Sequence, residues 1–237
     1  MLIQTKAIVI HSFPFKDNQV ITKLYTDLRG MVSTIVRLPK NSAKSKSALI
    51  QPLTLVDASV FLKENQDFVQ LRELQIWKPF RNLPFDFRKQ AQAMFVAELL
   101  RNAIKEEETN AVLFKFIVNQ LLLLDENDFY SASFHLQFML DLTKYLGFYP
   151  IVESYEKNYF LDLKEGFFTP IQTSSTCLAN ESKLLYDFSV STSKNSGLNS
   201  RFPRNVLFSI LERYYQHHLP NFPEMNTPGV MAGLFED

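Results

Sequence analysis

The chain contains 237 residues, of which 46% are hydrophobic and 21% charged, a balance typical of a globular protein rather than a disordered one. Only six glycines are present, which argues against folds built on glycine-rich phosphate loops, and the single cysteine excludes an intrachain disulfide. Charges balance over the whole chain, but residues 1–80 hold 11 Lys and Arg against 6 Asp and Glu, whereas the remainder holds 14 against 19. This asymmetry suggests a polyanionic partner for the basic first part.

The first third of the chain has the composition and alternation of short strands separated by turns. Because no clear helix separates any two of them, we expect an antiparallel arrangement. Five strands in so short a segment suit a small Greek-key barrel of the OB type, and an SH3-like barrel fits the pattern nearly as well. The strand segments are residues 7–10, 20–26, 31–38, 52–62 and 68–76, with a tight turn at 27–30 and a hairpin loop at 63–67.

From Asp86 onward the apolar residues recur at helical spacing, in stripes wide enough to bury one face of a helix. The stripes run over residues 91–104, 113–124 and 134–146, and the third ends at Gly147, a typical C-terminal cap. The remaining segments are a hairpin over 159–168, a polar loop over 189–200, and helices that begin near Pro203 and at Thr227. The sequence therefore predicts an α+β protein with a barrel over residues 1–79 and a helical domain over 80–237.

A search for catalytic chemistry finds none of the usual motifs of phosphate loops, dinucleotide sites, zinc proteases or serine hydrolases. Cys177 has no basic neighbour in the sequence to lower its pKa, so a buried or incidental thiol is expected. None of the four histidines has a cysteine or carboxylate at metal-ligand spacing, and His135 is expected at the edge of the core or on the surface. We therefore do not expect an enzyme.

The feature with a positive physical argument is the basic loop after the third strand. Four basic residues and no acid occupy residues 37–47, and small hydroxyl residues between them suit contacts to successive phosphates. The alternative is a solvated loop without a partner. Basic residues of the neighbouring strands would extend the track. The complete set of candidate DNA-binding residues is Lys23, Arg37, Lys40, Lys44, Lys46, Lys63 and Arg72.

Three aromatic residues on the expected strands, Tyr25, Phe61 and Phe68, could stack on nucleic-acid bases. Most aromatic side chains at strand spacing belong to the core, so at most one or two of the three should face a ligand. The first residues lack the features of a signal peptide, and the longest aliphatic run, Leu121–Leu124, is far shorter than the roughly 20 residues of a membrane span. We expect a cytoplasmic protein that does not enter a membrane.

The order and spacing of several segments along nearly the whole chain resemble RecO, the bacterial recombination-mediator family of DNA repair. The segments are residues 7–12 with 15–18, 25–30, 49–54, 97–100, 138–148 and 211–219. The resemblance implies an OB-fold domain followed by a helical domain. It also implies binding to single- and double-stranded DNA, strand annealing, and help in replacing single-strand-binding protein with RecA, together with RecR. A nucleoid-associated protein would then be expected.

One departure from the family concerns zinc. Many relatives carry a four-cysteine zinc site after the helix that here ends at Gly147, but residues 149–177 retain only Cys177. We therefore expect a degenerate zinc-finger-like hairpin within residues 151–180, held by its aromatic residues, and neither zinc nor any other cofactor. The expected partners are DNA, RecR and the C-terminal tail of single-strand-binding protein. The alternative is an OB-fold scaffold that binds proteins without touching DNA.

Overall fold

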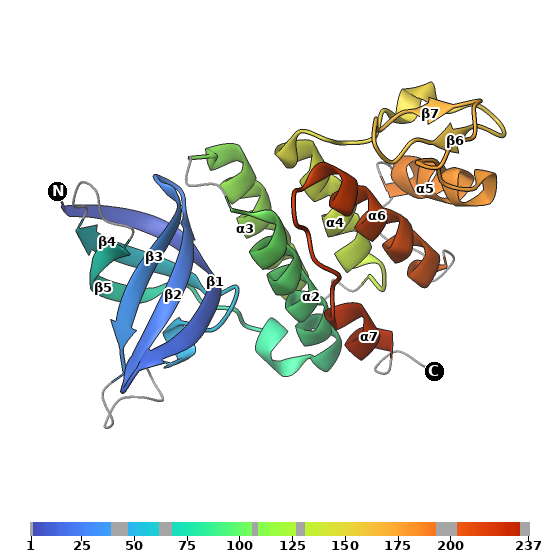
Figure 1. Cartoon of the computed structure of the whole chain (residues 1–237). Coiled ribbons are helices and arrows are strands. Elements are labelled where there is room, and N and C mark those ends of the chain that lie inside the picture. The colour runs from blue at the N-terminus through green and yellow to red at the C-terminus, as the bar shows by residue number, and fades with distance from the viewer. Residues whose placement is uncertain are drawn as a thin grey trace. The chain divides into compact units, whose positions relative to one another are not determined.

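The computed structural model describes residues 2–38, 47–61, 68–105, 109–126, 131–192 and 203–232 (Figure 1). The chain divides into two compact units, Met1–Asn127 and Asp128–Asp237. Among the described residues, the first unit contains the β-barrel and the helices α2 (Phe87–Ala103) and α3 (Ala111–Asp125), and the second contains α4 (Phe134–Leu146) to α7 (Thr227–Ala232) and a small hairpin. The sequence-based boundary between residues 79 and 80 stays a prediction. None of the helices in the described ranges is long and apolar enough to cross a bilayer.

The barrel is closed and has five strands, as predicted. Its strands are β1 (Leu2–Lys16), β2 (Gln19–Thr26), β3 (Gly30–Arg37), β4 (Leu55–Phe61) and β5 (Phe68–Lys78), in the spatial order β1-β2-β3-β5-β4 (Figure 1). All neighbours are antiparallel except β3 and β5, which pair in parallel through only Ser33↔Phe68 and Thr34↔Val69. The expected purely antiparallel arrangement is therefore wrong at one seam. Alternating directions cannot close a ring with an odd number of strands, so one neighbouring pair must be parallel.

Strand β1 is much longer than the apolar run 7–10 that signalled it, because it pairs with two neighbours in succession. Its first half pairs with β4 from Leu2 to Ile8, and its second half pairs with β2 from Ala7 to Lys16. A bulge between Val9 and His11 lies where the strand passes from one neighbour to the other. Burial along β1 is complete at and beside this overlap, at Ala7, Ile8 and Val9. The fully buried centre of the barrel comprises Ala7, Val9, Leu24, Val56, Ala58 and Val60.

The barrel is followed by the short 3-10 turn η2 (Leu83–Phe85) and by the helices α2 (Phe87–Ala103) and α3 (Ala111–Asp125). The Asp86 carboxylate caps α2 by accepting hydrogen bonds from the N–H groups of Arg88 and Lys89. The segment that follows β5 is held by Asp125, the last residue of α3. Its carboxylate accepts backbone hydrogen bonds from Arg81, Asn82 and Leu83 at 2.7–3.1 Å. The barrel is thereby tied to the end of α3.

In the second unit, helices α4 (Phe134–Leu146), α6 (Arg204–His218) and α7 (Thr227–Ala232) confirm the helices predicted there. Gly147 ends α4 with a φ of 86°, in the left-handed region. The predicted hairpin is present as β6 (Phe160–Leu161) and β7 (Phe168–Thr169), after the short turn η3 (Val152–Ser154).

Helix α5 (Ala179–Thr192) was not predicted, and the expected loop is wrong over residues 189–192. The apolar stripe of this helix is interrupted by serines on its buried face, because Ser182 and Ser189 are buried alongside Leu185 and Phe188. Both hydroxyls donate to carbonyls of the preceding turn, those of Leu178 and Leu185. Burying them is therefore tolerated, although their polarity hides the helical period.

Candidate nucleic-acid interface

The strands β3 and β5 enclose a cleft in the first unit. The two strands are joined at only two residue pairs, and Thr34 fastens the seam by donating its hydroxyl to the Val69 carbonyl at 2.9 Å. Beyond this point the strands separate and leave a cleft of about 650 Å³. The lining residues are Gln19, Ile35, Val36, Arg37, Leu49, Phe68, Val69, Gln70, Leu71, Arg72 and Leu74.

Two of the predicted DNA-binding residues, Arg37 and Arg72, meet at this cleft from opposite sides. Arg37 is the last residue of β3 and Arg72 lies on β5, and both side chains are exposed. None of the described residues that line the cleft is acidic, and among the described residues no ion pair joins either arginine to a carboxylate. The Arg72 guanidinium lies 5.9 Å from the centre of the Phe61 ring. Both positive charges are therefore available to an anion.

The third described candidate, Lys23, does not line the cleft. It points outward from β2 opposite Ser33, four residues along the ladder from the pair Gln19↔Arg37, which corresponds to about 13 Å of strand. Lys23 lies instead with His11 and Arg101 of α2. Burial first, and then the charges of Arg101 and Lys23, lower the pKa of His11.

Lys23, Arg101 and His11 form a second basic cluster, in which α2 meets the consecutive strands β1 and β2, far from it in the sequence. Arg101 was missed because nothing in its local sequence distinguishes it from any other exposed residue of a helix. Its relation to Lys23 arises only because α2 packs on β1. The predicted residues Lys40, Lys44, Lys46 and Lys63 lie outside the described residues and stay predictions.

The three aromatic candidates are in different situations. Tyr25 is buried, and its ring packs against that of Phe114 in α3 at a centroid distance of 6.1 Å, so it cannot stack on a base. Phe61 is half-buried beneath the Arg72 guanidinium. Phe68 is 42% exposed and lines the cleft. Of the three, Phe68 is the residue placed to face a ligand.

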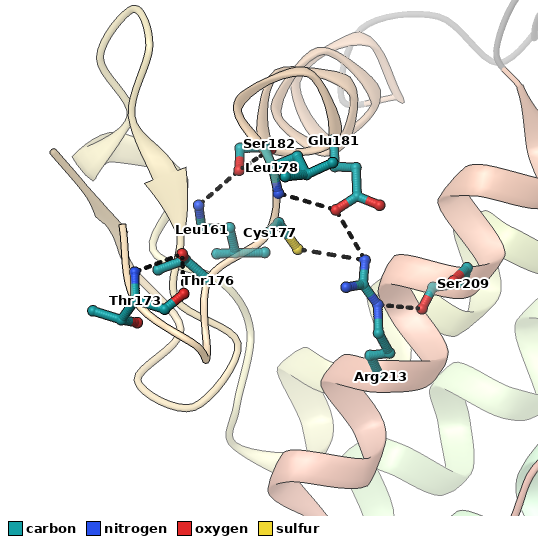
Figure 2. A network of polar contacts seen from close by, with 9 residues as sticks. All are labelled: Leu161, Thr173, Thr176, Cys177, Leu178, Glu181, Ser182, Ser209 and Arg213. Atoms are coloured by element: carbon teal, nitrogen blue, oxygen red, sulfur yellow. Dashed lines mark hydrogen bonds and ion pairs between the residues drawn. The ribbon is translucent and has the colours of Figure 1, made fainter. Parts of the chain in front are cut away.

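The hairpin region of the second unit is arranged differently, around Cys177 and Arg213 (Figure 2). Arg213 reaches from α6 and donates to the Glu181 carboxylate at 3.0 Å, with the same nitrogen 3.9 Å from the Cys177 sulfur. That carboxylate also accepts from the backbone N–H of Leu178 at 3.0 Å, at the start of α5. The positive charge of Arg213 is therefore paired with the Glu181 carboxylate within the protein.

Backbone and aromatic contacts complete this region. The Cys177 N–H donates to the Leu161 carbonyl. The Leu161 N–H in turn donates to the Ser182 hydroxyl (Figure 2). The rings of Tyr155 and Tyr186 are stacked at 4.0 Å, and both meet the Phe168 ring edge-on. Aromatic packing around Phe168 and the polar contacts of Arg213 and Glu181, which the sequence pattern did not indicate, together hold the hairpin in place.

Cys177 and His135 of the second unit are buried, and burial shifts the pKa of each toward its uncharged form. Burial raises the pKa of the Cys177 thiol to about 12; the positive charge of Arg213 opposes this shift and the negative charge of Glu181 adds to it. Because the pKa is so high, the thiol keeps its proton and the thiolate nucleophile is not formed. Burial, followed by the positive charge of Arg204, lowers the pKa of His135 to about 3. Among the described residues no group of three or more His, Cys, Asp or Glu could hold a metal ion. The expected lack of zinc stays a prediction.

Comparison with known proteins agrees with the barrel and helices. Residues 1–80 match the family model for "Recombination protein O N terminal", and residues 84–227 match the model for "Recombination protein O C terminal". The DNA repair protein RecO of Bacteroides fragilis is 33% identical over 243 residues, covering all of both chains. The protein of the same name from Flavobacterium psychrophilum is 35% identical over 240 residues, covering 99% of this chain and all of the relative.

The molecule is thus an α+β protein, in which an OB-like barrel with an open basic cleft is followed by helices. Together with the two matched models and the full-length relatives, this places the chain in the RecO family of DNA repair proteins.

Proposed function

We propose that this chain is a non-catalytic recombination mediator, which binds and anneals DNA strands and helps RecA to load on DNA coated by single-strand-binding protein. The observation that carries the proposal is the cleft between β3 and β5. Two arginines from different strands converge there without an acidic neighbour among the described lining residues. Membership in a DNA repair family makes a nucleic acid the natural polyanion for them.

The placement of the arginines also suits a strand of DNA. Arg37 lies on the β2–β3 face of an OB-like barrel, the face with which OB folds commonly bind oligonucleotides. Guanidinium groups bind phosphate oxygens through two parallel hydrogen bonds, which fixes the backbone in register without reading the sequence. Lys40, Lys44, Lys46 and Lys63 would extend the phosphate track, and Lys23 would contribute from the second basic cluster.

The protein partners belong to the same proposal. Residues 81–237 hold 14 basic against 19 acidic residues, so this part of the chain is on average a poor surface for DNA and a better one for proteins. We assign RecR and the C-terminal tail of single-strand-binding protein to it as partners, and the cytoplasm, in association with the nucleoid, as the location.

A fluorescence-anisotropy titration with a labelled oligonucleotide at low and high salt tests the proposal. Binding should weaken steeply with salt, because each neutralised phosphate releases a counterion. The double variant Arg37→Glu/Arg72→Glu, and separately the triple variant Lys40→Glu/Lys44→Glu/Lys46→Glu, should each bind more than tenfold more weakly at unchanged thermal stability.

A control of equal charge change separates the site from the general field of the protein. Lys115 on α3 and Lys157 in the second unit are exposed, and neither lines the cleft. The double variant Lys115→Glu/Lys157→Glu should keep most of the affinity. Binding that is absent or insensitive to salt would instead favour the alternative scaffold, in which the half-buried apolar residues of the cleft receive a peptide.

A further inference from the structure

We propose that the β3–β5 cleft is a base-binding site, which selects single-stranded over double-stranded DNA by taking one unpaired base against the Phe68 ring. The inference rests on the proposed DNA-binding function and adds to it the form of DNA that this cleft recognises. Four observations support it: the exposure of Phe68, the apolar lining, the two glutamine amides of the lining and the two arginines.

Phe68 is an unusual residue for its position. It is the first residue of β5 and is paired with Ser33 at the closing seam, yet its side chain is 42% exposed. Among the described residues its ring has no aromatic or cationic partner, in contrast to Phe61, which Arg72 covers. An exposed aromatic face beside a cleft offers a surface on which a base can stack.

The lining of the cleft matches the two parts of a nucleotide. Ile35, Leu49 and Leu71 are only half-buried, so they present apolar surface that a base would cover. Gln19 and Gln70 add amide groups, which can both donate to and accept from the polar edge of a base. The volume of about 650 Å³ lies within the range of small-molecule sites, roughly 300–1,000 Å³.

The arginines lie where the backbone of such a nucleotide would pass. Arg37 ends β3 and Arg72 lies four residues beyond Phe68 on β5, so the cations flank the cleft from two strands. A base inserted between them would bring its neighbouring phosphates toward both. Phosphate contacts alone do not distinguish one strand from two, so the selectivity must come from the base.

A base in a duplex cannot enter without leaving its stack. Its faces are covered by neighbouring bases and its polar edge is paired, and extruding it costs a few kcal/mol. An unpaired base in a single strand exposes both its face and its edge. The cleft should therefore favour single strands through Phe68, while the arginines bind both forms.

The test compares three probes of equal length: a thymidine single strand, the same strand with abasic sites in place of its central nucleotides, and a duplex. The thymidine strand should bind at least fivefold tighter than the abasic strand, since stacking one base is worth about 1–3 kcal/mol. Phe68→Ala should abolish this difference and leave duplex affinity unchanged within twofold. Phe68→Trp should restore it, with quenching of the new tryptophan by the stacked base.

Phe87→Ala is the matched control, because Phe87 is an exposed phenylalanine of the same unit that lies on α2 and does not line the cleft. This variant should keep the difference between thymidine and abasic strands. Equal binding of these two strands by the wild type, or an equal loss for all probes in Phe68→Ala, would overturn the base site while salt-dependent duplex binding still supports the proposed function. No binding of any probe would overturn both.

Discussion

The arginines of the β3–β5 cleft and the arginine of the hairpin region illustrate two uses of the same side chain. Arg213 donates to the Glu181 carboxylate and contacts the Cys177 sulfur, and its Nε also donates to the Ser209 carbonyl. Arg37 and Arg72 line a cleft whose described residues include no acid. The first arginine holds two parts of one unit together, whereas the other two present their charge outward.

The contacts of these arginines separate structural from functional charge within one protein. A cation whose donors are satisfied internally contributes to folding, and its loss leaves a carboxylate without its partner. A cation without an internal partner contributes little to folding and is available to a ligand. The contrast is therefore expected to appear as opposite patterns in stability and in DNA binding.

The largest expected effect on the free energy of unfolding comes from the packing of the hairpin at Gly166 against Tyr214 of α6. Gly166 has a φ of 75°, and a Cβ atom added there would lie 2.5 Å from the Tyr214 hydroxyl oxygen. Gly166→Ala should therefore lower the free energy of unfolding by about 3 kcal/mol, as strain and a steric clash combine. Chemical denaturation measures the change, and DNA affinity measured well below the transition should be unaffected.

Gly147 provides the control for backbone strain alone. Its φ is 86°, but an added Cβ would have no atom within 4 Å, so Gly147→Ala should cost only about 1–2 kcal/mol. Tyr214→Phe removes the clashing oxygen, at the loss of its hydrogen bond to the Phe148 carbonyl. The double variant Gly166→Ala/Tyr214→Phe should be more stable than the sum of the single changes predicts, and strict additivity would argue against the clash.

The sequence predicted most of these elements because their signals are local. Alternation over residues 31–38 and the stripe 134–146 ending at Gly147 were sufficient to identify β3 and α4. The cleft could not be predicted, since it depends on the parallel seam that an odd number of strands imposes. The partnership of Arg213 with Cys177 and Glu181 was equally hidden, because it depends on how α6 packs beside the hairpin.

A smaller effect is the loss of stability in acid, which we expect from the buried His135 of the second unit. The pKa of His135 is about 3 in the folded protein, below its value of about 6.5 in an unfolded chain, because burial and the charge of Arg204 disfavour the charged form. Between these values the unfolded chain binds the proton and the folded chain does not. Stability should be complete above pH 6.5 and should fall by about 1.4 kcal/mol per pH unit below it.

Urea unfolding at pH 7 and pH 5 measures this dependence. The wild type should lose about 2 kcal/mol from this group on going to pH 5, and His135→Gln should show a correspondingly smaller loss, whatever its stability at pH 7. His217→Gln, which changes an exposed histidine of α6, should retain the wild-type dependence. Equal pH dependence in all three proteins would show that His135 is not the responsible group.

The smallest expected change in stability tests the difference between Arg213 and the two cleft arginines most directly. The same replacement of arginine by glutamine is made in both regions. Arg213→Gln should cost about 1 kcal/mol, since its pair with Glu181 is partly exposed to solvent. It should also slow the reaction of Cys177 with a thiol reagent further, because Arg213 is the charge that opposes the rise of the pKa of this buried thiol to about 12. Arg37→Gln/Arg72→Gln should change neither the labelling rate nor stability by more than about 0.5 kcal/mol.

DNA binding should show the reverse order in the same three proteins. The cleft variant should lose more than tenfold in affinity and show a shallower dependence on salt, because two phosphate contacts are removed. Arg213→Gln should bind DNA as the wild type does, because its charge is already held by Glu181. A cleft variant that is clearly destabilised would mean that Arg37 and Arg72 have structural partners, and the distinction between the two regions would then fail.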